Sequence, residues 1–144
     1  MKFSDFAVGQ VLEGGPYLVD EAAIIDYATR FDPQPFHIDK EAAKSSHFRG
    51  IIASGFHTCA IAMRLVADSI LLDSGSCGSP GLDFVKWPAP VYAGDTLRLR
   101  VRVLEVRHSK AGAYGVVRWQ WDLLNQRSQS VLELVATSLF ARAG

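Results

Sequence analysis

The hydrophobic periodicity of this chain changes near Leu82, from a helical period of about 3.6 residues to a strand period of about 2. Residues 56–72 are apolar on almost every side, which predicts a buried helix. Apolar and polar residues then alternate in four segments, residues 82–87, 96–107, 117–123 and 131–142. One long helix followed by antiparallel strands predicts an α+β fold in which the sheet wraps a central helix.

The first half of the chain carries signals for shorter elements. A Gly-Gly-Pro turn at residues 14–16 separates two apolar pieces and predicts either a first strand or a broken pair of strands. Asp20 and Asp39 are each expected to cap the start of a helix. The Gly- and Ser-rich residues 73–81 predict a flexible loop after the long helix. No repeat or second domain is visible, so we expect residues 1–144 to form a single domain.

The composition limits the partners and the compartment. With 144 residues, 49% of them apolar, the chain is large enough for one domain with its own core. Its fifteen basic and fifteen acidic side chains balance, which argues against nucleic acid or an anionic membrane as a partner. Cys59 and Cys77 do not suggest a disulfide framework, and neither a signal region nor an apolar run of roughly 18 residues is visible. We therefore expect a reduced, cytoplasmic protein.

Asp32 and His37 are five residues apart, with Pro33 and Pro35 between them. Each proline fixes its own φ, lacks an N–H group and disfavours the α conformation in the residue before it, so a helix is not expected here. A regular strand would point the two side chains to opposite faces. The segment is therefore predicted to be a stiff loop that holds a carboxylate and an imidazole together, as an acid/base pair requires.

Residues on both sides of this loop occur in a recognisable order. The first group is Tyr27-Ala28, Asp32-x4-His37-x-Asp39, Ala42, Phe48 and Ile52-Ala53-Ser54-Gly55, and the second is Pro90-Val91-x3-Gly94-Asp95-Thr96-Leu97. Together they resemble the signature of the MaoC-like dehydratases and (R)-specific enoyl-CoA hydratases, and the resemblance covers most of the chain. It implies a hot dog fold and the reversible addition of water to the trans-2,3 double bond of an acyl thioester.

The resemblance also implies a role for individual residues. Asp32 is expected to be the principal base on the attacking water, and His37 its partner on that water. The Gly55 N–H, at the start of the long helix, is expected to donate to the thioester carbonyl as it gains enolate character. The residues expected to bind the substrate are Phe31, Gln34, Phe36 and Ser54.

Three of these positions depart from the usual family pattern. That pattern reads Gly-Asp-x-Asn-Pro-x-His, whereas here Phe31 precedes the aspartate and Gln34 replaces the asparagine. Ser54 stands before the helix glycine, where histidine is frequent. The departures leave the acid/base positions intact and concern the pocket around them.

The resemblance implies coenzyme A as the carrier of the acyl substrate, with acyl carrier protein as the alternative carrier, and no other cofactor. It also implies a homodimer with the acyl tunnel at the interface. His47, His57 and His108 share no ligand spacing, so no metal site is expected.

Other functions and roles stay open. An acyl-CoA thioesterase of the same fold would use Asp32 to direct water at the carbonyl, and a non-catalytic acyl-thioester binding module would carry a degraded site. Structural roles compete at each site residue: a turn cap for Asp32, a satisfied buried histidine for His37, close packing for Gly55 and a helix N-cap for Ser54. The row of Arg98, Arg100 and Arg102 forms either a solvated sheet face or a grip on the phosphates of coenzyme A. Trp119 and Trp121 belong to the core or to an interface.

Overall fold

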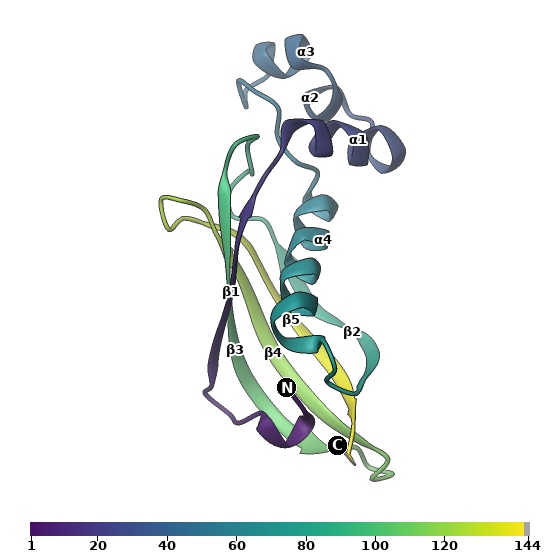
Figure 1. Cartoon of the computed structure of the whole chain (residues 1–144). Helices are drawn as coiled ribbons and strands as arrows, with labels where there is room; N and C mark the ends of the chain where they lie inside the picture. The colour runs from purple at the N-terminus through teal and green to yellow at the C-terminus, as the bar shows by residue number, and fades with distance from the viewer. Residues whose placement is uncertain (143–144) are drawn as a thin grey trace.

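The computed structural model describes residues 1–142 as an antiparallel sheet with a long helix, α4 (Gly55–Val66), lying along one face (Figure 1). The strands are β1 (Val11–Leu18), β2 (Ser76–Lys86), β3 (Thr96–His108), β4 (Tyr114–Leu124) and β5 (Ser130–Ala141). They form one five-stranded sheet in the order β1-β3-β4-β5-β2. The other helices are η1 (Phe3–Asp5), α1 (Glu21–Phe31), α2 (Pro35–Ile38), α3 (Lys40–Ser45) and the π-helical turn η2 (Ala67–Leu71). The predicted α+β arrangement is confirmed.

Side chains alternate across the sheet in β3 and β4, as the period of 2 predicts. The buried residues of β3 are Leu97, Leu99, Val101 and Val103, and the exposed ones between them are Arg98, Arg100 and Arg102. In β4 the buried set includes Val117, Trp119, Trp121 and Leu123. Trp119 packs edge-on against Phe6 and Phe140, with ring centroids 5.5 and 6.2 Å away. Both tryptophans therefore lie in the core of the single chain.

The N-terminal segment forms one strand rather than a pair. β1 pairs with β3 along its length, and the register shifts between Gly14 and Tyr17, where the Gly-Gly-Pro turn was expected. Gly15 has φ +97°, a conformation that favours glycine. A Cβ on Gly14 would lie 2.5 Å from Ser69 Oγ, so glycine allows β1 to pass close to the end of the long helix.

The predicted flexible loop at residues 73–81 is wrong over most of its length, because β2 begins at Ser76. Its pairing with β5 supplies backbone partners for residues whose side chains show no alternating pattern. The register shifts along this pairing, and Gly78 and Gly81 have positive φ values of 103° and 155°. The glycines thus serve bulges in an edge strand, where sequence composition alone suggests flexibility.

The long helix begins and ends close to the predicted positions but is not buried on all sides. Its inward residues, Ile61, Ala62, Leu65 and Val66, pack into the core. The outward residues Phe56 and Met63 are exposed in the single chain. The prediction of all-round burial is wrong because the sheet covers only one side of the helix. No helix within residues 1–142 has the length and apolar character needed to cross a membrane.

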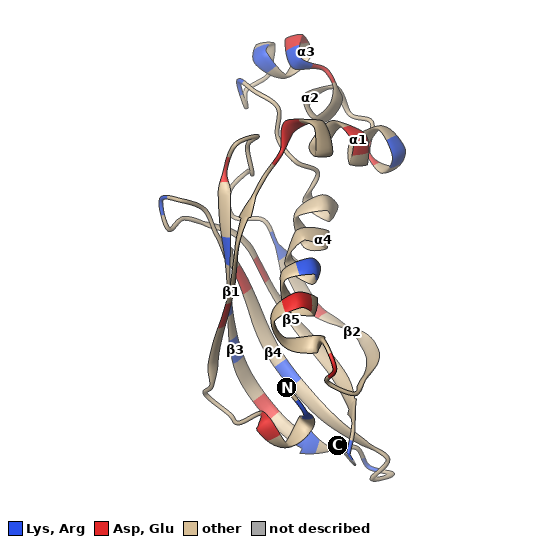
Figure 2. Cartoon of the chain, in the orientation of Figure 1, with Lys and Arg blue, Asp and Glu red and all other residues tan. Residues whose placement is uncertain are grey.

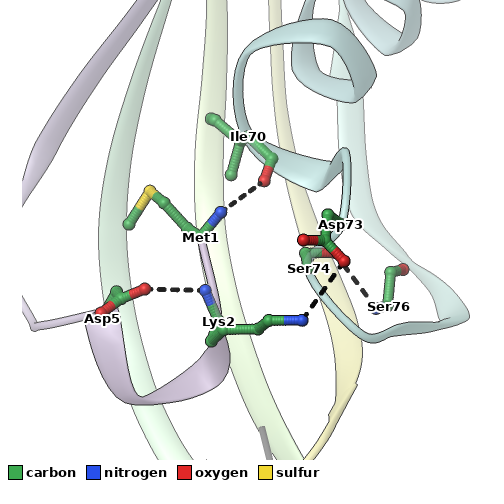
Figure 3. A network of polar contacts seen from close by, with 7 residues as sticks. All are labelled: Met1, Lys2, Asp5, Ile70, Asp73, Ser74 and Ser76. Carbon is green, nitrogen blue, oxygen red and sulfur yellow. Dashed lines mark hydrogen bonds and ion pairs between the residues drawn. The ribbon is translucent and has the colours of Figure 1, made fainter.

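The far end of this helix is tied to the start of the chain (Figure 3). The Met1 amino group donates to the Ile70 carbonyl oxygen at 3.2 Å. Lys2 Nζ lies 3.5 Å from Asp73 Oδ1, just beyond η2. These contacts fix η2 beside η1, at the opposite end of the helix from α1, α2 and α3 (Figure 1).

Helices α1 to α3 form a separate layer at the start of α4 (Figure 1). Both predicted caps are confirmed: the Asp20 carboxylate accepts from Ala23 N, and the Asp39 carboxylate accepts from Glu41 N and Ala42 N. The predicted stiff loop is wrong in its second half, where Pro35–Ile38 forms the helical turn α2. Pro35 suits this turn because the first helical position needs no N–H donor and the ring already has a helical φ.

Candidate active site

The structure brings Asp32 and His37 together. Asp32 ends α1, with its N–H bonded to the Ala28 carbonyl at 2.8 Å, and His37 lies in the next helical turn, α2. Asp32 Oδ2 is 3.3 Å from His37 Nε2. The side chains are 22% and 5% exposed respectively, so the carboxylate keeps an opening while the imidazole is enclosed. The predicted convergence of the two groups is therefore present, with a short helix in place of part of the loop.

A backbone carbonyl orients the imidazole of His37. Its Nδ1 lies 2.6 Å from the Ile52 carbonyl oxygen. A carbonyl oxygen only accepts hydrogen bonds, so Nδ1 carries the hydrogen. In the neutral ring, Nε2 then presents a lone pair toward Asp32, and both facing groups are acceptors. A water molecule that donates one hydrogen to each of them satisfies both, and a protonated His37 would instead donate directly to the carboxylate.

The surroundings of Asp32 favour its ionised form. Gln34 Nε2 donates to Asp32 Oδ1 at 2.7 Å. Burial by itself raises the pKa of Asp32, but the Gln34 hydrogen bond, the Ser54 hydroxyl and the positive charge of a protonated His37 lower it, and the net pKa lies below the ordinary 3.8. The Ser54 Oγ is buried and has no hydrogen-bond partner within residues 1–142.

Ser54 and Gly55 form the start of α4 beside this pair. Ser54 occupies the N-cap position, but its side chain makes no capping hydrogen bond. Among residues 1–142 no group accepts a hydrogen bond from the Gly55 N–H, as is usual for the first residues of a helix. Figure 2 shows no charged residue in the first half of α4. Arg64, in the last turn of α4, pairs with Asp68 of η2 at 3.0 Å.

An indole ring covers Gly55. Trp87 Nε1 donates to the Gly55 carbonyl oxygen at 2.9 Å, and a Cβ on Gly55 would lie 2.6 Å from the Trp87 ring. Glycine at this position therefore allows close approach of Trp87. Sequence reasoning missed Trp87 as a site residue, because the contact joins positions 32 residues apart that no spacing rule connects.

A cavity of about 380 Å³ opens onto the acid/base pair, and we call it the acid/base cavity. Five of the predicted site residues line it: Asp32, Gln34, His37, Ser54 and Gly55. The other two predicted substrate contacts lie elsewhere. Phe31 is 70% exposed and packs at a tilt against Tyr27, and Phe36 packs against His37 and Phe48 outside the lining.

A second, apolar cavity of about 530 Å³ lies beside α4, and we call it the apolar groove. Helix α4, strand β2 and the inward face of the sheet each contribute to its lining. Its apolar residues include Cys59, Met63, Leu71, Leu82 and Trp121. The row of Arg98, Arg100 and Arg102 lines neither this groove nor the acid/base cavity.

His57 belongs to the packing behind the site. It is buried and stacks on Tyr27, with ring centroids 4.6 Å apart and an interplanar angle of 12°. Burial lowers the pKa of His57, which favours the neutral ring. It lines neither cavity, so the geometry gives it a structural place rather than a part in the acid/base pair.

The chain is similar to a family model and to several known proteins. A family model described as the MaoC like domain matches residues 5–120. The crystal structure of the MaoC-like dehydratase from Rhodospirillum rubrum is 40% identical with a TM-score of 0.91, over 100% of this chain and 99% of that one. The uncharacterised protein YdeM of Bacillus subtilis (strain 168) is 32% identical over 133 residues, which are 92% of this chain and 94% of YdeM.

A more distant structure supports the same fold. The R-hydratase PhaJ1 from Pseudomonas aeruginosa, in its unliganded form, has a TM-score of 0.79 and 24% identity, over 97% of this chain and 85% of that one. The predicted hot dog fold is confirmed by these structural likenesses together with the sheet and helix described above.

Proposed function

Because the chain belongs to the MaoC-like domain family, as its signature residues predicted, we propose that it is an (R)-specific enoyl-thioester hydratase. In the reverse direction the same hydro-lyase dehydrates a 3-hydroxyacyl thioester. The observation that carries the proposal is the Asp32–His37 pair, 3.3 Å apart, in a cavity that also receives the start of α4. A carboxylate and an imidazole placed this way have the geometry to hold and activate one water molecule.

In the proposed reaction, a water that bridges the two side chains from the open side of the cavity attacks the β-carbon of the enoyl thioester. Asp32 takes a proton from this water as its oxygen bonds to the β-carbon. A proton then passes from Asp32 to the α-carbon, so that one water has been added and the enzyme returns to its starting state. His37 holds the water through Nε2, since the Ile52 carbonyl keeps the hydrogen on Nδ1.

The thioester carbonyl oxygen gains negative charge before the α-carbon is protonated, so it needs a hydrogen-bond donor. We assign this part to the Gly55 N–H, which has no acceptor within residues 1–142 and lies at the positive end of α4. Loss of one such donor typically lowers the rate by about 10²–10³ in other enzymes. Ser54 and Gln34 line the same cavity and are proposed to contact the substrate near this carbonyl.

We further propose acyl-CoA as the substrate and a homodimer as the working assembly. The exposed apolar side of α4 and the free outer edge of β2 support the dimer, because a single chain leaves both uncovered. A cytoplasmic location is also proposed, which the free thiols of Cys59 and Cys77 support.

The test follows the absorbance of crotonyl-CoA while a thiol reagent monitors free coenzyme A. We expect loss of the enoyl absorbance without thiol release, and a fall of about 10²–10⁴ in kcat for Asp32→Asn and His37→Ala. Asp26→Asn is the matched control, since this carboxylate lies on the same helix and is exposed. A coupled (S)-3-hydroxyacyl-CoA dehydrogenase should find no substrate in the product.

Each contrary result points to a defined alternative. Thiol release without alkene loss would replace the proposal with a thioesterase. Tight binding of crotonyl-CoA without turnover would replace it with a binding module. Full activity in Asp32→Asn would remove the acid/base pair from the mechanism.

A further inference from the structure

The acid/base cavity and the apolar groove meet at one side chain. Phe56 lines both of them, and within residues 1–142 it is the only residue that does so. It follows Gly55 directly in α4, and its side chain is 69% exposed in the single chain. An aromatic ring is therefore shared by the cavity that holds Asp32 and His37 and a larger apolar space.

Trp87 holds this ring in place from the side of the acid/base cavity. The two rings meet edge-on, with centroids 5.9 Å apart and an interplanar angle of 65°. Trp87 is itself fixed by its hydrogen bond to the Gly55 carbonyl and by close contact over Gly55. Trp87 lines the acid/base cavity but not the groove, and we call the Phe56–Trp87 pair, at which the two spaces meet, the wall.

The position of the wall has a consequence for the substrate. With its carbonyl at the Gly55 N–H and its β-carbon at the water, an enoyl thioester extends the rest of its acyl chain from this point. The apolar groove is of the size of ordinary ligand pockets, and its lining is suited to a hydrocarbon chain. Phe56 stands at the passage to it.

We propose that the Phe56–Trp87 wall determines acyl length: the native enzyme takes short enoyl thioesters, and removal of the Phe56 ring admits longer chains into the groove. This inference rests on the proposed hydratase function and adds the size of its substrate. Phe56 acts here as a specificity residue, separate from the acid/base pair.

The experiment compares kcat/KM for crotonyl-CoA, trans-2-octenoyl-CoA and trans-2-dodecenoyl-CoA. The wild type should prefer crotonyl-CoA. In Phe56→Ala the ratio of octenoyl to crotonyl kcat/KM should rise by about tenfold or more, since even one methylene in an apolar pocket is worth about that factor. Phe56→Leu should give a smaller rise. Leu72→Ala is the matched control, because Leu72 is equally exposed near the same helix and lines neither cavity.

The ratio separates specificity from damage, because a folding defect lowers all three rates together. A wild type that prefers dodecenoyl-CoA, or a Phe56→Ala ratio within twofold of wild type, would overturn the wall while leaving Asp32-dependent hydration intact. If the wild type hydrates none of the three, the proposed function fails. Calorimetry with butyl- and dodecyl-CoA thioethers then tests whether the wall limits acyl length. A gain in relative dodecyl affinity in Phe56→Ala supports it, and an unchanged ratio overturns it.

Discussion

Gln34 shows how a departure from the family pattern is accommodated at the level of one residue. Its amide reaches Asp32 Oδ1 at 2.7 Å, so the longer side chain still supports the carboxylate. The pKa of Asp32 lies below 3.8 because hydrogen bonds and His37 outweigh burial, which alone would raise it. The proposed base is thus ionised throughout the neutral range, and no pH adjustment is needed to activate it.

Replacing Gln34 by methionine tests this support. Gln34→Met keeps the length of the side chain but removes the donor, so the pKa of Asp32 should rise. Because Asp32 must be ionised to act, the acid limb of kcat/KM against pH should move to higher pH, whatever the lost substrate contact of Gln34 does to the rate on the plateau. The measurement is the full pH profile of crotonyl-CoA hydration. An acid limb at the same pH in both proteins would show that Gln34 does not set this pKa.

At the level of elements, a strand could be predicted from the sequence where its own side chains alternate between core and solvent. β3 and β4 were predicted because their side chains alternate between core and solvent. The first half of β2 was missed because its glycines and serines have no such pattern, and its structure comes from pairing with β5. The Asp32–His37 pair joins residues five apart and was predicted. The cover that Trp87 places over Gly55 was not, because it is a tertiary contact between residues 32 apart.

Gly55 has two roles at the start of α4. Its N–H is the proposed donor to the thioester carbonyl, and its lack of a Cβ allows the close approach of Trp87. Gly55→Ala retains the N–H but places a Cβ against Trp87, so we expect a loss of about 1–3 kcal/mol in the free energy of unfolding, measured with urea. In a Trp87→Ala background the same change should cost much less and leave hydration near the level of Trp87→Ala alone. Equal costs in both backgrounds would contradict the contact as the reason for glycine.

The whole chain presents an apolar side that its own sheet does not cover. Phe56 and Met63 are exposed on the outward side of α4, and within residues 1–142 no further strand pairs with the outer edge of β2. The balance of fifteen acidic and fifteen basic residues offers no repulsion between copies. The proposed self-association through this side would cover both features at once.

A charge on that side should break the proposed dimer. We expect light scattering to give twice the 15.8 kDa chain mass for the wild type and a single-chain mass for Met63→Glu. The reason is that burying an unpaired carboxylate in an interface is strongly unfavourable. Val8→Glu is the control, since Val8 is exposed in the turn before β1, which forms the opposite edge of the sheet from β2, and the change should leave the dimer intact. A wild-type monomer at micromolar concentration would contradict the assembly.

The partner that orients His37 is a backbone carbonyl, 2.6 Å from Nδ1, and this limits what mutagenesis can reveal. Any side chain at position 52 that preserves the local backbone leaves the same oxygen in place. An alanine scan would therefore identify Asp32 and His37 and pass over Ile52, although the Ile52 carbonyl decides which nitrogen of the His37 ring carries the hydrogen. Weakening the Ile52 carbonyl as an acceptor requires a change of the backbone itself, such as an ester in place of the peptide bond between Ile52 and Ala53.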